Sequence, residues 1–360
     1  MKKIAILGTN GLPAKYGGFE TLANYLSLHF SNENEVYVYC SKSKHKLKKC
    51  SGANLIYFPF SANGFQSIIY DFFTIIHALF FCDVLIILGF SGAFAFPLNK
   101  IFKKKIIFNL GGIEWKKVRG TKITSKMEIF LKKLMEYLCV KFSSFVIIDN
   151  EYFKDYIINK YKVLPILAEY GGDHAIFQKV ENEDLFHYDF LNANYDLTIS
   201  RAQSDMNIHL IIDAYKKTSK RKIIIISNWS ISDYGKDLYS RYHNAYENII
   251  LLNAIYDLKL LNKIRSNCKL YIHSHSLCGT APSLVEIMNL GIPVICFDVP
   301  TNRFTTENES KYFRTSEELV HIINKLDTVF LKEISHKMKL IADRRYYWKR
   351  ITNIYRKLLY

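Results

Sequence analysis

The sequence predicts an α/β protein with two doubly wound, Rossmann-like domains, each built on a parallel sheet. Two observations predict this class: short β-branched and aliphatic segments alternate with segments of helical period, and the alternation occurs in both halves of the chain. The length of 360 residues also favours two domains, because one domain takes about 100–200 residues. We therefore expect one domain at residues 1–180 and another at 190–335, facing each other across a cleft.

The first series begins with an expected strand at residues 2–7, which stops at a glycine-containing loop. Apolar residues recur at helical spacing from Phe19 to Phe30, and a second strand is expected at 35–40. Further strands are expected at residues 54–58, 84–88, 105–108 and 145–148, and a helix at 124–139.

Residues 65–98 are the segment that most resembles a membrane span. Its longest run without Asp, Glu, Lys or Arg is Val84 to Leu98, which is shorter than the about 20 residues that a span needs. We therefore expect a buried helix followed by a buried strand, and no transmembrane helix. The apolar run at residues 4–7 is also too short for a signal peptide.

The second series follows a polar, less regular stretch at residues 171–194. Its expected strands are 195–199, 222–226, 249–252, 269–273 and 293–297, and its expected helices are 207–216, 256–266 and 283–290. The basic segment 334–360 has helical period throughout, and its part at 340–360 is expected to pack back on the first domain. Because ligands of such sheets bind beyond the carboxyl ends of the strands, the cleft is the expected site.

The seven cysteines contain no Cys-x-x-Cys pair, and most lie within or beside apolar stretches. We therefore expect neither a disulfide framework nor a zinc site, and a reducing cytosol as the compartment.

The formal net charge of +16 suggests nucleic acid, an anionic membrane surface or phosphorylated small molecules as partners. Nucleic acid is disfavoured because the aromatic residues fall within expected strands and helices and no nucleic-acid-binding motif is present. Residues 1–173 hold 23 Lys and Arg against 13 Asp and Glu, so +10 of the charge lies there. Attraction to anionic lipid is the preferred interpretation, and an ordinary solvated Lys-rich surface is the alternative.

A first candidate motif runs from Gly8 to Glu20. Its glycines allow a ligand to approach the backbone, and a helix N-terminus follows that attracts anions. The spacing matches neither Gly-x-Gly-x-x-Gly nor Gly-Lys-Ser/Thr, which excludes the common nicotinamide and nucleotide-triphosphatase fingerprints. A phosphate or sugar near this loop and an ordinary tight turn both remain open.

A second candidate motif runs from His273 to Glu286, from a strand end to a helix start. Thr280 is the expected N-cap, and the helix is expected to begin near Pro282 or Ser283. The amides there suit a diphosphate, and Glu286 is placed to accept hydrogen bonds from sugar hydroxyls. The alternative makes Glu286 a solvated helix carboxylate and the histidines ordinary polar loop residues.

Two further motifs follow expected strands. At residues 200–207, Arg201 can bind phosphate oxygens with two donors, and a plain surface arginine is the alternative. At residues 109–117, Glu114 beside Trp115 suits an acceptor sugar, with the carboxylate as a possible base. A structural tryptophan with an exposed glutamate is equally compatible with this pattern.

On these motifs the chain resembles glycosyltransferases of family 4 with the two-domain GT-B fold. More narrowly, it resembles the bacterial rhamnosyltransferase-type branch used in capsule, O-antigen and cell-wall polysaccharide synthesis. The stretches that carry the resemblance are distributed along almost the whole chain: 8–21, 109–117, 170–173, 200–207, 253–257, 265–286 and 297–303. The resemblance implies an acceptor-binding N-terminal domain and a C-terminal domain that binds a nucleotide-sugar.

The resemblance also assigns roles to particular residues. It implies a catalytic set that consists of Arg201, Glu114 and Asn109. It implies a donor-binding set that consists of Gly17, Gly18, Arg201, Asn228, His275, Thr280, Ala281, Pro282, Ser283 and Glu286. It implies an acceptor-binding set that consists of Lys15, Tyr16, Glu20 and Trp115. No metal and no cofactor are expected, and the donor is expected to be linked to dTDP or UDP.

Several positions depart from the pattern of this branch. Cys278 stands where the family has the earlier of two paired glutamates, and residues 203–206 replace a Glu-Pro-Glu-Asn run. These departures motivate an alternative function, a catalytically impaired homologue that serves as a binding subunit of a polysaccharide assembly complex.

The expected function is that of a hexosyltransferase in capsule, O-antigen or lipooligosaccharide synthesis. It would transfer a hexose or 6-deoxyhexose, with rhamnose favoured, to a glycan acceptor carried on polyprenyl diphosphate. The resemblance implies a retaining and metal-independent reaction. The expected location is the cytoplasm, at the inner face of the plasma membrane.

Overall fold

The computed structural model describes residues 1–14, 17–44, 46–113, 126–218 and 221–360. The described residues form two compact units. The first comprises residues up to 113, 126–170 and 348–360, and the second comprises residues 171–347.

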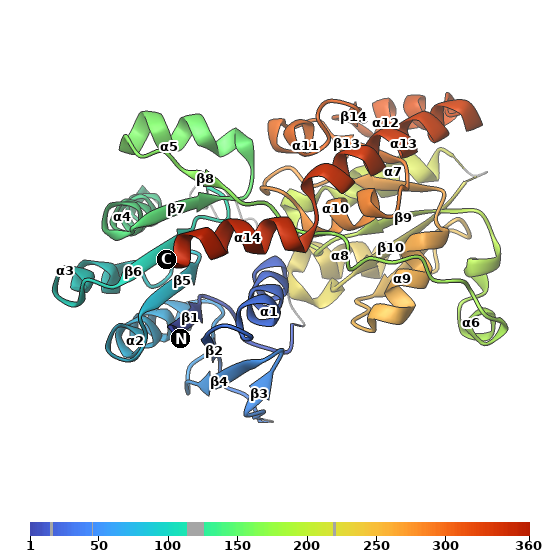
Figure 1. Cartoon of the computed structure of the whole chain (residues 1–360). Coiled ribbons are helices and arrows are strands. Elements are labelled where there is room, and N and C mark those ends of the chain that lie inside the picture. Colours follow the sequence, from blue (N-terminus) through green and yellow to red (C-terminus); the bar gives the residue numbers. More distant parts are fainter. Residues whose placement is uncertain (15–16, 45, 114–125, 219–220) are drawn as a thin grey trace. The chain divides into compact units, whose positions relative to one another are not determined.

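The first unit is built on an eight-stranded sheet in the order β3-β4-β2-β1-β5-β6-β7-β8 (Figure 1). Every neighbouring pair is parallel except β3 and β4. Its strands are β1 (Lys3–Leu7), β2 (Glu35–Cys40), β3 (Lys49–Cys50), β4 (Ala53–Tyr57), β5 (Val84–Leu88), β6 (Lys105–Asn109), β7 (Phe145–Ile148) and β8 (Ile166–Leu167). The predicted strands are confirmed, and the two-residue strands β3 and β8 were not predicted.

Helices cover this sheet, and a hydrophobic cluster joins buried residues of its strands to residues of the helices. They are α1 (Gly18–Phe30), α2 (Gln66–Phe81), α3 (Asn99–Phe102), α4 (Lys126–Phe142), α5 (Lys154–Tyr161) and α14 (Trp348–Leu359), with 3₁₀ turns η1 (Ala93–Leu98) and η3 (Glu151–Phe153).

Helix α2 and strand β5 occupy the segment that resembles a membrane span. The predicted helix is present and is buried on one face only, since Phe73 and Phe80 are exposed on the other. Strand β5 is buried along its whole length, as predicted. In the part of the chain that the structure describes, no helix combines the length and apolar character needed to cross a membrane.

The C-terminal segment forms two helices where the sequence predicted one. Helix α13 (Thr328–Arg345) belongs to the second unit, and α14 belongs to the first. The break falls at Tyr346, whose carbonyl oxygen accepts from the Gly172 amide at 2.9 Å and from Asn289 Nδ2 at 2.9 Å instead of continuing a helix. Within the first unit, Trp348 at the start of α14 stacks on Tyr25 of α1, with ring centroids 4.2 Å apart.

The second unit is built on a six-stranded parallel sheet in the order β11-β10-β9-β12-β13-β14 (Figure 1). Its strands are β9 (Tyr195–Ile199), β10 (Lys222–Ser227), β11 (Ile249–Asn253), β12 (Leu270–His273), β13 (Val294–Phe297) and β14 (Lys311–Phe313). All except β14 were predicted.

Helices again cover the sheet and enclose a second hydrophobic cluster. They are α6 (Asn182–His187), α7 (Ile208–Lys216), α8 (Asp233–Tyr242), α9 (Leu258–Asn267), α10 (Pro282–Asn289), α11 (Pro300–Thr305), α12 (Ser316–Asn324) and α13, with 3₁₀ turns η4 (Asp189–Asn192), η5 (Ser204–Met206) and η6 (Trp229–Ile231). Helices α7, α9 and α10 were predicted.

Each sheet has one point where the strand order reverses. In the first unit, β2 follows β1 on one side and β5 lies on the other; in the second, β10 follows β9 on one side and β12 lies on the other. At such a point the loops leave two neighbouring strands in opposite directions. This opens a crevice at the carboxyl ends of the two strands, where ligands of such sheets bind. The predicted motifs at 8–20, 200–207 and 273–286 follow β1, β9 and β12, so all three lie at these points.

Candidate functional site

The switch point of the second unit brings two of the predicted motifs together. The loop after β9 and the loop after β12 are joined because the Ser276 amide and hydroxyl both donate to the Asp205 carbonyl, each at 2.9 Å. Asn207 Nδ2 also donates to the Ser274 carbonyl at 3.0 Å. These three bonds hold the backbone of one loop against the other.

Arg201 is exposed on the first of these loops. In the described part of the chain its guanidinium has no carboxylate partner, whereas other arginines of this unit are paired. Desolvation holds the pKa of His275 well below its usual value, and the neighbouring His273 and the positive charge of Arg201 add to this effect. Arg201 and His275 are therefore close enough to interact electrostatically, and His275 is neutral near pH 7.

Helix α10 begins at Pro282, as the sequence predicts. The prediction that Thr280 caps this helix is wrong, because Ala281 is the N-cap and no side chain caps the helix. Thr280 and Ala281 are buried just outside it, and Ser283 lies in its first turn. A helix N-terminus that no side chain caps retains its positive partial charge for an anion.

Glu286, one turn into α10, is 7% exposed, so the alternative of a solvated carboxylate is wrong. Its Oε1 lies 2.9 Å from His174 Nε2, and its Oε2 accepts from the guanidinium of Arg265. Burial alone would raise the pKa of Glu286, but the charge of Arg265 and the contact with His174 outweigh it and lower the pKa. Glu286 is therefore held as an oriented carboxylate.

Sequence reasoning did not identify His174 and Arg265. They lie 112 and 21 residues from Glu286 in the sequence, on a loop and on α9, so no spacing pattern links them to it. The nearby Gly172 lies in the stretch 170–173, which carries the resemblance but assigns this residue no role. A Cβ at this position would lie 2.4 Å from the Val285 carbonyl oxygen, so only glycine allows this loop to approach α10 so closely.

Two other donor-set residues are placed by neighbouring elements. The carbonyl of His275 accepts from Asn302 Nδ2 at 3.0 Å, and Asn302 also donates to the carbonyl of Phe297 at 2.8 Å. Asn302 therefore anchors the loop to the end of β13. Asn228 follows β10, and its Oδ1 accepts from the Ser230 hydroxyl at 2.9 Å.

The switch point of the first unit holds Gly17, Gly18 and Glu20. Gly17 is the extended N-cap of α1, and Gly18 is its first residue. Glu20 is buried, and its Oε1 accepts from the Asn10 amide at 2.9 Å and from Asn10 Nδ2 at 3.3 Å. The carboxylate thus holds the loop after β1 in shape.

Gly8 opens this loop with φ +84°, directly after the last residue of β1. A Cβ there would lie 2.0 Å from the Leu88 carbonyl oxygen. This position therefore accepts only glycine.

Asn109 lies at the end of β6 and is fully buried. Its Nδ2 donates to the Tyr355 hydroxyl at 2.6 Å, and its Oδ1 accepts from the Gly111 amide at 3.0 Å. Both ends of the amide are used within the first unit, which favours a positioning role over direct contact with a reacting group. The predicted site residues Lys15, Tyr16, Glu114 and Trp115 lie outside the described residues.

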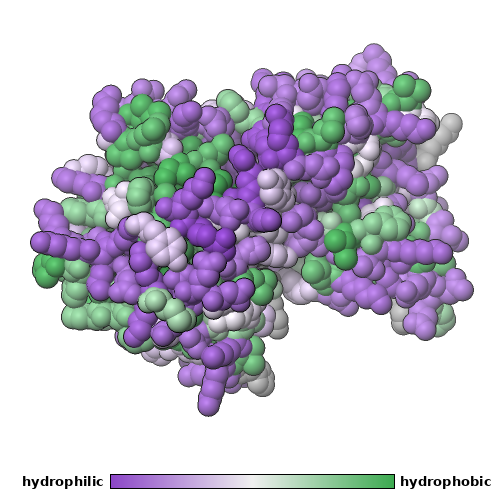
Figure 2. All heavy atoms as spheres, viewed as in Figure 1, coloured by the Kyte–Doolittle hydropathy of each residue, from purple (hydrophilic) through white to green (hydrophobic). Residues whose placement is uncertain are grey.

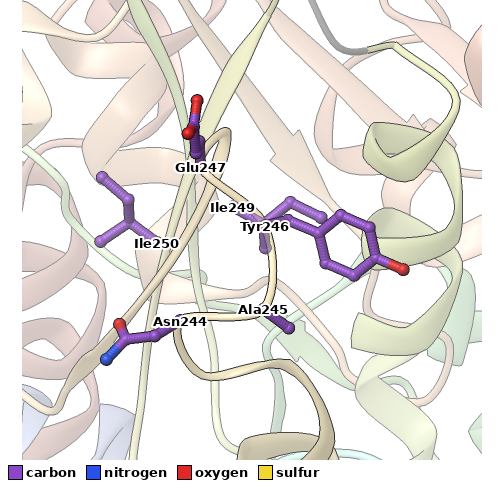
Figure 3. A pocket seen from close by; sticks show the side chains of 6 residues that line it. All are labelled: Asn244, Ala245, Tyr246, Glu247, Ile249 and Ile250. Carbon is purple, nitrogen blue, oxygen red and sulfur yellow. The ribbon is translucent and has the colours of Figure 1, made fainter.

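A shallow pocket elsewhere in the second unit does not contribute to this site (Figure 3). It lies at the amino end of β11 and around the turn before it, whereas the site residues follow the carboxyl ends of strands. Glu247 is its one ionisable carboxylate. The pocket is lined by Asn244, Ala245, Tyr246, Glu247, Ile249 and Ile250.

A family model matches residues 1–173 and is described as a domain of unknown function, DUF1972. No curated protein matches the sequence.

Solved structures match the whole chain. Sucrose-phosphate synthase from Thermosynechococcus elongatus is 14% identical with a TM-score of 0.78, and HepE from Anabaena in complex with UDP and glucose is 17% identical with a TM-score of 0.78. Each match covers 100% of this chain and 99% of the other. A putative UDP-N-acetylglucosamine 2-epimerase from Listeria monocytogenes is 11% identical with a TM-score of 0.63, over 98% of this chain and 94% of the other. At these identities the matches show the fold, which is the predicted GT-B fold with two parallel sheets.

Proposed function

We propose that this chain is a glycosyltransferase that takes a sugar from a nucleotide-sugar donor bound at the switch point of the second unit. The observation that carries the proposal is the exposed guanidinium of Arg201 on a loop hydrogen-bonded to the one that leads into the uncapped N-terminus of α10. An arginine fork and helix-end amides together suit a diphosphate. HepE, which shares the fold, was solved with UDP-glucose as well as with UDP and glucose.

The proposed roles follow from the contacts of each residue. Arg201 and the first amides of α10 stabilise the charge that develops on the diphosphate as the bond to the sugar breaks. Glu286, kept ionised by Arg265, accepts hydrogen bonds from hydroxyl groups of the donor. Gly17 lets the backbone at the start of α1 approach a ligand closely. No step of this scheme uses a metal ion, and the reaction is proposed to retain the anomeric configuration.

The proposed donor carries a hexose or 6-deoxyhexose, with rhamnose favoured, on dTDP or UDP. The proposed acceptor is a lipid-linked glycan of capsule, O-antigen or lipooligosaccharide synthesis, bound by the first unit. Two features support an acceptor at the inner membrane face: +10 of the charge falls in residues 1–173, and apolar side chains are exposed there. Phe80 is 73% exposed, and Ile101, which lies between Lys100 and Lys103 in sequence, is 76% exposed. On the face shown in Figure 2, hydrophobic residues lie among hydrophilic ones.

A second candidate is a catalytically impaired homologue that binds a donor or glycan within a polysaccharide assembly complex. The observation that favours it is Cys278, which stands where the family that this chain resembles has a glutamate. A thiol is a much weaker hydrogen-bond acceptor for sugar hydroxyl groups than a carboxylate.

The test is to incubate the purified chain with UDP-, dTDP- and GDP-sugars, with and without lipid-linked acceptors. Released nucleoside diphosphate is measured, and binding of each donor and acceptor is measured by calorimetry. The proposal expects turnover with at least one donor. Binding of a donor without any release, across the full panel, would favour the impaired homologue. Absence of both binding and release would contradict both functions.

A further inference from the structure

We propose that His273, His275 and Cys278 form a binding site for Zn²⁺. Each of the three residues offers one ligand atom, and these atoms all lie within 4.8 Å of one another. This inference departs from the sequence-based expectation of no metal, and it does not depend on the proposed glycosyl transfer.

The positions of the three side chains suit one tetrahedral ion. His273 is the last residue of β12, and His275 and Cys278 lie in the loop that follows. The rings of His273 and His275 have centroids 4.1 Å apart, and Cys278 Sγ lies 3.5 Å from His275 Nδ1. Bonds of about 2.0–2.1 Å to nitrogen and about 2.3 Å to sulfur place tetrahedral ligand atoms roughly 3.3–3.7 Å apart. His275 Nδ1 and Cys278 Sγ are therefore already at this spacing, and the ligand atoms of all three residues lie within 4.8 Å of one another.

The histidine nitrogens supply the independent evidence for a ligand. His273 is fully buried, and neither of its ring nitrogens has a hydrogen-bond partner among the described residues. His275 Nε2 is buried and without a partner in the same part of the chain. Buried polar atoms normally have partners, since leaving them without one costs free energy. A metal bond to one nitrogen of His273 would use a lone pair that has no partner, and a metal bond to His275 Nδ1, the nitrogen near Cys278, would leave Nε2 to carry the proton of that ring.

The donor set points to zinc rather than to a hard cation. Imidazole and thiolate bind Zn²⁺ well, whereas Mg²⁺ and Ca²⁺ prefer oxygen ligands. The positive charge of Arg201 near His275 opposes any cation, and the thiolate of Cys278 partly offsets it. Three protein ligands leave one coordination position for water or for another ligand.

The consequence for the fold is a fixed loop. A metal ion held by the end of β12 and by Cys278 would tie the strand to the segment that leads into α10. Because Zn²⁺ would bind only the folded chain in this way, it should raise the unfolding temperature of the protein.

The test uses the full chain after removal of bound metal with a chelator. Zn²⁺ is titrated in competition with a chromogenic chelator, and Co²⁺ is added separately to look for a thiolate-to-metal charge-transfer band. The variants are Cys278→Ser and His275→Ala, since replacement of the fully buried His273 is prone to unfold the chain. Cys50→Ser is the matched control, because Cys50 and Cys278 are the two cysteines that are not fully buried.

The proposal expects one equivalent of Zn²⁺ bound to the unaltered chain and to Cys50→Ser, with a Co²⁺ charge-transfer band in both. Cys278→Ser should lose the band and bind Zn²⁺ at least roughly tenfold more weakly, while its unfolding temperature without metal stays close to that of the unaltered chain. His275→Ala should also weaken binding. The proposal is overturned if the unaltered chain binds no Zn²⁺, or if Cys278→Ser binds it equally well.

Discussion

The two switch points of this molecule share a backbone design but use their polar side chains in opposite ways. In the first unit, Glu20 and Asn109 direct their polar atoms to neighbouring backbone and to Tyr355. In the second unit, Arg201 is exposed without an ion pair among the described residues, and the ring nitrogens of His273 are buried without partners there. The difference indicates that the first site is organised by backbone shape and the second by charge.

The largest expected effect is on stability and concerns the buried ion pair of the second unit. Arg265→Met leaves the carboxylate of Glu286 buried without its guanidinium partner. We expect a loss of about 3–5 kcal/mol in the free energy of unfolding, measured by denaturant titration. Arg241→Met, which removes an exposed ion pair with Asp237, should cost no more than about 1 kcal/mol. Equal losses in the two variants would contradict the assigned importance of the buried pair.

The same pair should give the protein a characteristic dependence on pH. Because the pKa of Glu286 is lowered in the folded state, its contribution to stability is complete above the pKa of an unfolded glutamate, about 4.3. The contribution is lost as pH falls through the folded-state pKa. Thermal unfolding between pH 3 and pH 7 should therefore show a steeper acid loss in the unaltered chain than in Glu286→Gln.

The next effect is on turnover and concerns Arg201, the exposed positive charge at the switch point of the second unit. Arg201→Ala removes a guanidinium that has no structural partner among the described residues, so the fold should be unchanged. Transfer or donor hydrolysis should fall by roughly a hundredfold, because a group that stabilises developing charge is lost. Arg241→Ala is the control for loss of a positive charge from the same unit. Unchanged turnover in Arg201→Ala would remove that residue from the mechanism.

A smaller effect is expected in the first unit, where Tyr355→Phe removes the partner of Asn109 Nδ2. Leaving that buried donor without its partner should cost about 1–3 kcal/mol of unfolding free energy. Nucleotide affinity should not change, because the nucleotide is assigned to the second unit. A change in nucleotide affinity without a change in unfolding free energy would contradict the comparison, because Tyr355 of the first unit would then contribute to nucleotide binding and not to the shape of its own site.

The smallest stability effect is expected for Gly17→Ala. Gly17 is extended, and a Cβ there would lie 3.4 Å from Glu20 Oε2, which is ordinary contact. The free energy of unfolding should change by no more than about 0.5 kcal/mol. If a ligand approaches this backbone as proposed, turnover should still fall by at least roughly tenfold. Full activity in this variant would mean that Gly17 is not needed for close approach of a ligand and contributes only to the turn before α1.

Much of the fold was predictable because its strands are continuous apolar runs between loops. The strands that were missed, β3, β8 and β14, have two or three residues, too few to show a pattern. The break between α13 and α14 was missed because it is set by hydrogen bonds to the carbonyl of Tyr346 from Gly172 and Asn289, not by a local proline or glycine.

The candidate site was predictable in part, and for a related reason. The switch-point loops were found because they directly follow strands and contain glycine or a helix start. His273, His275 and Cys278 lie within six residues of one another in the sequence, so their spacing was open to interpretation as a metal site. The network of Glu286 with Arg265 and His174 depends instead on which side chains the fold brings together. Spacing along the chain does not encode such contacts, so only the structure could identify them.

The most direct test of the central claim is calorimetric titration of UDP and dTDP into the unaltered chain, Arg201→Ala and Arg241→Ala. The account predicts saturable binding of at least one of these nucleotides at a single site, weakened by roughly a hundredfold in Arg201→Ala and unchanged in Arg241→Ala. Equal affinity in all three proteins, or no binding to the unaltered chain, would contradict it.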